Sequence, residues 1–313
     1  MPEEIKLNNP LLVAVWPGMG NVAITAGYYL MSKLGMHDLV EFSAREHFEV
    51  DHVEVKNGII QSGRLPRSRL FVWNDPEKKQ DVLVFIGEAQ PPLGRARFCR
   101  QLLEFAKLLG VKKVYTFAAM ATDMLPAQTS RVFAAATDEE TLKELQNQDV
   151  EVLEEGHISG LNGVLLGIAK EMGIPGGCLL GEMPSFFPNA PFHGGSLAVL
   201  RVFCKAVSLD IDLDELVEQA EEMSQQLSEV LEKVEQKLRE QREDRDEDDD
   251  GPEFPYMPEE EPPRVSPVDE KRIEQLFARA REDRSKAYEL KKELDRLKVF
   301  DLYEDRFLDL FKK

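Results

Sequence analysis

Residues Leu7–Ser32 carry no charged side chain. A run of this length could cross a bilayer, which needs about 20 apolar residues. However, residues that favour turns interrupt the run, namely Pro10, Pro17, Gly18, Gly20, Asn21 and Gly27. The run therefore predicts a buried strand at 11–16, a tight turn, and a helix at 22–34. We expect a soluble protein with no membrane partner.

Short aliphatic strands alternate with helical periods as far as residue 207. Strands are predicted at 38–42, 81–86, 113–119, 131–136, 150–153 and 177–180, and two or three more between 52 and 73 around the turns at Asn57-Gly58 and Leu65-Pro66. Helices are predicted at 95–109, 138–145, 161–172 and 196–207. Such alternation predicts an α/β fold with helices on both faces of a sheet.

The period of the apolar residues changes at Leu213. From there, apolar residues recur alternately three and four positions apart, which predicts a coiled-coil seam. Residues 239–261 then hold 12 acidic and 3 basic side chains, a composition typical of a disordered linker. We expect an α/β domain at 1–208 and a helical extension at 209–313, divided into a helix at 209–241, an acidic linker at 242–267 and helices at 268–311. The simplest arrangement is a helical hairpin whose helices pack on each other or on a partner; packing within the chain alone is the alternative.

The charge and the cysteines exclude several classes of protein. Acidic residues number 58 and basic residues 39, so the net charge is −19, which argues against binding nucleic acid or anionic membranes. Cys99, Cys178 and Cys204 lie far apart, which excludes a disulfide scaffold and a common zinc module. We expect a cytoplasmic protein with no cofactor and no metal.

Two glycine-rich turns are candidate anion-binding sites. Gly18, Gly20 and Asn21 follow a predicted strand and precede a helix, as in a dinucleotide-binding turn. The alternative is a tight turn that needs glycine only for its backbone geometry. The second turn precedes the helix at 161–172, where phosphate or a plain helix cap would fit. Its candidate residues are Ser159, Gly160, Asn162 and Gly163.

Two carboxylates follow predicted strands, Glu88 after 81–86 and Glu182 after 177–180. Ligands of open α/β sheets bind at the carboxyl ends of strands, so both groups could share a cleft; the alternative is two separate, solvated loops. We name no catalytic residue. Apolar interface candidates come from a proline-stiffened loop and from the seam; they are Phe186, Phe187, Phe192, Leu216, Met223, Leu227 and Val230.

Several segments resemble the proteasome assembly chaperone 2 family of archaea and bacteria. They are Ile158–Gly167, Gly173–Pro184, Trp16–Ala23 and Gly27–Leu30. The resemblance covers roughly residues 8 to 207. It implies a three-layer α/β/α sandwich, phosphorylase- or hydrolase-like, that forms homo-oligomers, and several bacterial members carry a helical C-terminal extension.

The resemblance also implies a role in protein assembly without established catalysis. Family chaperones engage the proteasome through a C-terminal hydrophobic-Tyr-any tripeptide, whereas this chain ends Leu310-Phe311-Lys312-Lys313 and holds Leu302-Tyr303-Glu304 internally. We therefore expect a homo-oligomeric, protein-binding protein resembling an assembly chaperone, more plausibly a non-enzyme. The alternative is a small-ligand binder or enzyme of nucleoside-phosphorylase or hydrolase type that uses the glycine-rich turns and the carboxylates.

Overall fold

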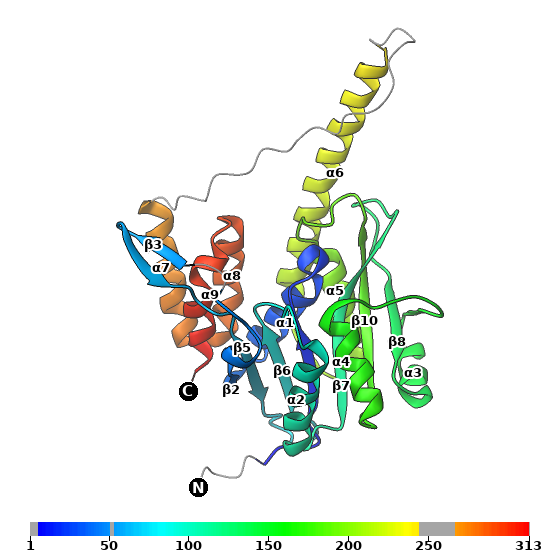
Figure 1. The fold of residues 1–313 in the computed structure, drawn as a ribbon. Coiled ribbons are helices and arrows are strands. Elements are labelled where there is room, and N and C mark those ends of the chain that lie inside the picture. The colour runs from blue at the N-terminus through cyan, green and yellow to red at the C-terminus, as the bar shows by residue number, and fades with distance from the viewer. Residues whose placement is uncertain (1–5, 51–52, 244–266, 313) are drawn as a thin grey trace.

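An eight-stranded mixed sheet lies at the centre of the fold (Figure 1). The computed structural model describes residues 6–50, 53–243 and 267–312. The strand order is β2-β5-β6-β1-β7-β10-β8-β9, in which β6, β1, β7 and β10 run parallel. The strands are β1 (Leu11–Val15), β2 (His37–Phe42), β5 (Ser68–Trp73), β6 (Val82–Gly87), β7 (Lys113–Thr122), β8 (Val132–Ala136), β9 (Glu151–Val152) and β10 (Gly176–Pro184).

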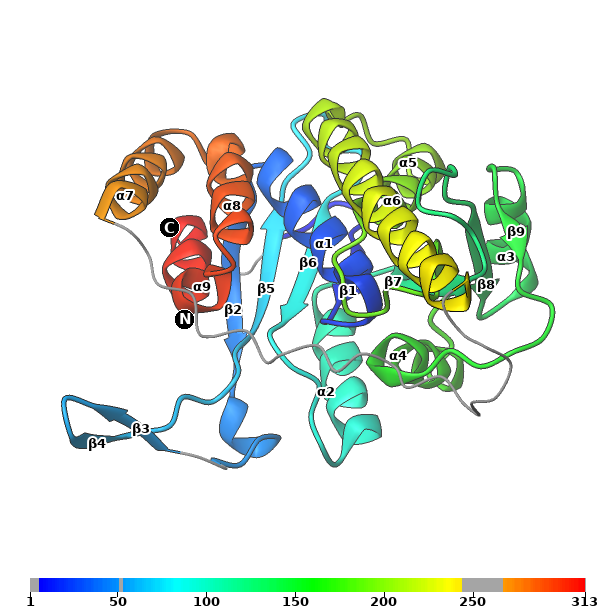
Figure 2. The same ribbon diagram turned by 90° about the horizontal axis from the view of Figure 1, so that it is seen from above.

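Helices cover both faces of the sheet (Figure 2). Alternate residues of β1 serve opposite faces, because side chains along a strand point up and down in turn. Leu12 and Ala14 pack beneath α2 and α4, whereas Val13 and Val15 pack beneath α1 and α5. The helices of the α/β body are α1 (Val22–Lys33), α2 (Arg95–Leu108), α3 (Glu139–Gln146), α4 (Gly160–Glu171) and α5 (His193–Ala206). The predicted α/β fold is thereby confirmed as a mixed sheet flanked by helices. No helix in the described ranges is both long and apolar enough for a membrane span.

The C-terminal helices pack on the body of the protein. They are α6 (Asp214–Glu243), α7 (Pro267–Glu282), α8 (Ala287–Arg296) and α9 (Phe300–Leu308). The rings of Tyr29 and Tyr288 lie 4.4 Å apart, and those of Tyr28 and Phe307 lie 5.8 Å apart, so α8 and α9 both contact α1. The buried residues of these helices form one apolar cluster with α1 and the sheet.

This packing differs from the expected hairpin between the first extension helix and the next. In the structure α7 pairs with α8, and α8 lies between α7 and α1 (Figure 2). The Tyr288 hydroxyl of α8 also donates to Oε1 of Gln219 on α6, so the first extension helix contacts α8 as well. The physical reason is the apolar area available for burial. Nearly every residue of α1 is buried, so α1 offers the C-terminal helices more apolar surface than the narrow seam of α6 does. Most of the predicted acidic linker, residues 244–266, lies outside the described residues.

A small hairpin stands apart from the main sheet. β3 (Val53–Lys56) and β4 (Ile59–Ser62) pair antiparallel with each other in a two-stranded sheet. Asn57 and Gly58 both have positive φ, 53° and 75°, as a tight two-residue hairpin turn requires. The strands predicted around Asn57-Gly58 are therefore confirmed.

Candidate functional site

Four neighbouring parallel strands end at the same edge of the sheet. Because β6, β1, β7 and β10 are parallel, the segments that follow them meet there, and this edge holds the ligand in many open α/β sheets. Both glycine-rich turns and both candidate carboxylates lie at or near this carboxyl edge. The question is whether their polar groups face a ligand or one another.

The turn after β1 is covered by the chain itself. The Gly20 amide donates to the carbonyl of Pro188 (3.0 Å), and the Phe192 amide donates to the carbonyl of Gly20 (2.8 Å). Gly20 has φ +58°, and a Cβ there would lie 2.7 Å from the sulfur of Met183. Gly20 is therefore needed for turn geometry and close packing. Gly18 and Asn21 are exposed on either side of it.

The turn before α4 is occupied by the side chain of Gln90. The Leu161 amide donates to Oε1 of Gln90 (3.1 Å), and Nε2 of Gln90 donates to the carbonyl of Pro17 (3.2 Å). Ser159 holds the N-cap position without a side-chain cap hydrogen bond. Gln90 thus sits where an anion would bind the start of this helix. Sequence reasoning did not single out Gln90, although it lies only two residues after Glu88.

The other residues of this second turn serve packing. A Cβ on Gly160 would lie 2.9 Å from Oε1 of Gln90, and one on Gly163 would meet the Ile158 carbonyl. Asn162 is buried, and its carbonyl accepts a hydrogen bond from Oγ1 of Thr116 (3.2 Å). The Asn162 carbonyl therefore fastens α4 to β7, and Gly163 allows the close approach of the preceding loop.

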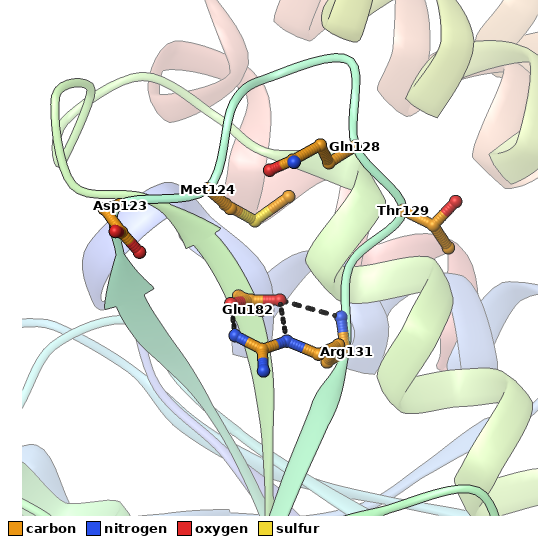
Figure 3. Close-up of a pocket in the computed structure, with 6 residues that line it drawn as sticks. All are labelled: Asp123, Met124, Gln128, Thr129, Arg131 and Glu182. Carbon is orange, nitrogen blue, oxygen red and sulfur yellow. Dashed lines mark hydrogen bonds and ion pairs between the residues drawn. The ribbon is translucent and has the colours of Figure 1, made fainter.

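Glu182 forms a closed ion pair with Arg131 (Figure 3). Arg131 donates through Nε (2.9 Å), Nη2 (2.5 Å) and its backbone amide (3.1 Å), and Oγ1 of Thr122 donates at 2.8 Å. These bonds, those from Arg131 above all, lower the pKa of Glu182 to about 2, so the carboxylate stays ionised at neutral pH. Such a group is a poor general acid or base.

A pocket of about 400 Å³ opens beside this ion pair. In Figure 3, Asp123, Gln128 and Thr129 surround the pair at the rim, with Met124 between them. Arg131 was placed in a predicted strand but not recognised as a site residue. An arginine at the start of a strand carries no sequence signal for its partner, which lies 51 residues away in the chain.

Glu88 belongs to a different cluster from Glu182. Its carboxylate accepts hydrogen bonds from Nη2 of Arg64 (2.6 Å) and the Arg67 amide (2.8 Å). Both arginines also pair with Asp305 of α9, so Glu88 helps to hold the C-terminal helices. The two predicted carboxylates therefore share no partner. Across the residues with described positions, no group of three or more His, Cys, Asp or Glu side chains is suited to hold a metal ion.

A partly buried carboxyl group lies where α9 meets α1. The Tyr28 hydroxyl donates to Oε1 of Glu304 at 2.5 Å. Burial, followed by the charge of nearby Glu88, raises the pKa of Glu304 from 4.5 to about 7, against the opposing effects of the Tyr28 hydrogen bond and the charge of Arg64. Burial also raises the pKa of Glu88. The docked helix therefore favours protonated Glu304.

This raised pKa predicts that docking of α9 weakens as the pH rises. The folded state keeps its proton on Glu304 up to about pH 7, whereas the unfolded chain releases it near 4.5, so stability falls across this window. We expect Glu304 to contribute a loss on the order of 2 kcal/mol in unfolding free energy between pH 5.5 and 8, from a shift worth about 1.4 kcal/mol per pKa unit. Burial lowers the pKa of His193 from 6.5 to about 4, which contributes a gain over the same range, so the Glu304 contribution is the difference between wild type and a Glu304 variant. Urea unfolding at both pH values measures it.

The variant Glu304→Gln, which keeps the Tyr28 contact without a titratable charge, should lose the Glu304 contribution and be more stable than wild type at pH 8. Glu282→Gln, at an exposed position on α7, is the matched control and should leave the dependence unchanged. An equal pH dependence in Glu304→Gln and wild type would contradict the assignment.

The apolar interface candidates divide into buried and exposed residues. Phe192, Leu216 and Leu227 lie within the chain's own core, between 0% and 7% exposed. Phe187 and Met223 pack partly against that core. Two candidates face solvent, Phe186 at 61% and Val230 at 45% exposure.

Further apolar side chains join Phe186 at the carboxyl edge. Met19 follows β1 and Leu125 follows β7, and they are 47% and 49% exposed. With Phe186 after β10, they extend from three adjacent strands, and we call these three residues the apolar rim. α6 passes beside the rim, where Oγ of Ser224 donates to the carbonyl of Pro126, the residue after Leu125 (2.6 Å). Met19 and Leu125 were missed because single apolar residues in loops carry no periodic signal.

Comparison with known proteins places these features in a family. PbaB of Pyrococcus furiosus, described as an archaeal proteasome activator, is similar in structure with a TM-score of 0.61 and 28% identity, over 74% of this chain and 96% of that one. The fold of PbaA from the same organism, described as an archaeal homolog of proteasome-assembly chaperone, matches with a TM-score of 0.58 and 23% identity, over 76% and 94%. An uncharacterised protein of Methanocaldococcus jannaschii is 27% identical over 215 residues, which are 67% of this chain and 78% of that protein. The model of the PAC2 family matches residues 12–231, and the chain therefore belongs to the PAC2 family.

Proposed function

We propose that the protein acts as a homo-oligomer that binds other proteins, in the manner of an assembly chaperone. The observation that carries this proposal is the contrast at the carboxyl edge. Gln90 and Glu182 are bonded there to the chain itself, whereas the side chains of the apolar rim face solvent. Exposed apolar side chains of this kind mark sites of protein contact.

We further assign residues 1–208 to a three-layer α/β/α sandwich and residues 209–313 to a helical extension. Helices on both faces of the sheet support the three layers (Figure 2). On this assignment the extension thickens the layer that contains α1 and carries α6 past the rim, where Val230 and Val234 remain exposed. The rim and the outer part of α6 then form one binding surface.

The proteasome core particle is the first partner to test, because PbaB is described as a proteasome activator. The contact must differ from a C-terminal tripeptide: Tyr303 is partly buried, and Glu304 is bonded to Tyr28. Phe186 is the expected anchor, since aromatic side chains contribute most at interfaces. The helical extension and the rim would hold the partner through apolar burial.

We expect Phe186→Ser to weaken binding to the core particle at least tenfold. This corresponds to about 1.4 kcal/mol, the smaller end of the effect of losing an aromatic anchor. Biolayer interferometry with the purified full-length chain and purified core particles measures it. Leu108→Ser is the matched control, because Leu108 is 85% exposed at the end of α2, which covers the face of the sheet opposite α1.

Wild-type binding with no loss in Phe186→Ser would exclude the rim as the surface. Absence of wild-type binding at tens of micromolar would exclude the proteasome as the partner. The alternative, a small-ligand site, predicts a rise in melting temperature with phosphate, nucleosides or nucleotides. The position of Gln90 argues against a small-ligand site at this turn, because its side chain occupies the start of α4.

A further inference from the structure

An arm leaves the sheet between β2 and β5. Its outbound leg is residues 42–50, its tip is the hairpin of β3 and β4, and its return leg is residues 63–67. The hairpin lies away from the main body (Figure 2). Its two strands form a sheet of their own, so the outer edges of β3 and β4 are not paired within the described chain.

One face of the hairpin is apolar and open to solvent. Val55 and Ile60 are cross-strand partners, 67% and 69% exposed, and Val53 lies on the same face at 54%. Residues one position along a strand face the other way, so Ile59, paired with Lys56, lies on the opposite face. Two strands alone are marginally stable in water. We therefore expect another protein surface to pack on this exposed apolar face.

A hollow of about 820 Å³ lies between the two legs of the arm. Phe42, Phe48 and Val50 line it from the outbound leg, and Leu65 lines it from the return leg. Phe42 packs by its edge on the rings of Phe85 and Phe105, so this floor is fixed to the core. Glu41, Arg45 and Arg67 also line the hollow, so the arm carries a projecting apolar face beside a recess with apolar walls and a charged rim.

The charge of the arm suits a second copy of the same chain. Residues 42–67 hold four acidic and four basic side chains, whereas the whole chain has a net charge of −19. Two such acidic chains repel each other over most of their surfaces. Contact through a segment with no net charge avoids this repulsion. A strongly basic partner would gain little at this segment and more elsewhere.

We propose that two copies of the chain dimerise by exchanging arms about a two-fold axis. The Val53, Val55 and Ile60 face of each hairpin lies in the hollow of the other copy. Because each copy has both the projecting hairpin and the hollow, the same contact forms twice in the dimer, as two-fold symmetry requires. This inference rests on the proposed homo-oligomer and names its contact surface.

Lysines on the hairpin test the surface in the full-length protein. In the variant Val55→Lys with Ile60→Lys, we expect the mass from light scattering to fall at least twofold, because two charges would enter an apolar contact. The variant should remain folded by circular dichroism, since both positions are exposed in the monomer. Ile59→Lys, on the other face of the same hairpin, is the matched control and should keep the wild-type mass.

Single cysteines test the seating of the hairpin. A chain with Ile60→Cys is mixed with a chain with Leu65→Cys and oxidised; the native Cys99, Cys178 and Cys204 are buried. We expect the mixed disulfide to exceed either self-linked product at least fivefold. A mixture of Ile60→Cys with Leu302→Cys, an exposed position on α9, should give little mixed product.

The outcomes separate this inference from the proposed function. A double-lysine variant that keeps the wild-type mass would overturn arm exchange and leave the homo-oligomer standing. A predominant Ile60–Ile60 disulfide would place hairpin against hairpin and exclude the hollow as the seat. A wild-type chain that stays monomeric at 100 µM would overturn both the arm exchange and the homo-oligomer, while binding to the core particle is measured independently.

Discussion

Phe307→Ala is expected to lower the free energy of unfolding by about 4 kcal/mol, the range for removing a buried aromatic ring. Phe307 is fully buried in α9, and its ring lies 5.8 Å from Tyr28, 5.5 Å from Phe300 and 5.7 Å from Phe311. The alanine leaves a cavity at the contact between the C-terminal helices and α1. Urea unfolding followed by tryptophan fluorescence and circular dichroism measures the loss.

Leu302→Ala is the control for this prediction. Leu302 lies on the same helix at 71% exposure, so its loss should change the free energy by less than about 0.5 kcal/mol. A similarly small change in Phe307→Ala would mean that α9 does not belong to the cooperative core. In that case the C-terminal helices would unfold separately from the α/β body, as two independent domains divided near residue 208 would.

Gly163→Ala is expected to destabilise the protein by about 3 kcal/mol, the upper part of the usual range for overpacking. A Cβ at this position would lie closer than 3.0 Å to the carbonyl oxygen of Ile158, a separation that real Cβ atoms essentially never show. Because the obstacle is backbone, α4 or the preceding loop must move. Thermal and urea unfolding both measure the effect.

Gly167→Ala provides a control of opposite sign on the same helix. Gly167 is exposed, and a Cβ there would meet nothing within 4 Å. Alanine forms helix better than glycine, so we expect a gain of up to about 1 kcal/mol. Equal stabilities for the two variants would show that Gly163 has no packing role and would reopen the case for a functional turn at Ser159–Gly163.

The sheet was predictable because its strands are locally encoded. The aliphatic runs at 11–16 and 81–86 became β1 and β6, and the Asn57-Gly58 pair became the hairpin turn. Strand order and the antiparallel placement of β5 and β8 depend on contacts between distant residues, so no local pattern indicated them. The path of the C-terminal helices was missed for the same reason: amphipathic periodicity shows that a helix has an apolar face but not what covers that face.

The candidate site shows the same division. Sequence placed Gly20, Glu88, Ser159 and Glu182 near the carboxyl edge, because they follow strands or precede helices. It did not indicate that Gln90 would occupy the second turn, since that contact joins residues 71 positions apart.

The sequence by itself determined most of the secondary structure and the strong negative charge, because periodicity, turn residues and composition act over short distances along the chain, and the resemblance of its motifs indicated the family. Only the tertiary structure decided which polar groups bond to each other and which apolar residues stay exposed. Leu227 and Val230 lie three residues apart on one predicted seam, yet the first is 7% and the second 45% exposed. The difference arises because α6 leaves the body between them, and a position in space relative to the rest of the fold is a property that no local pattern specifies.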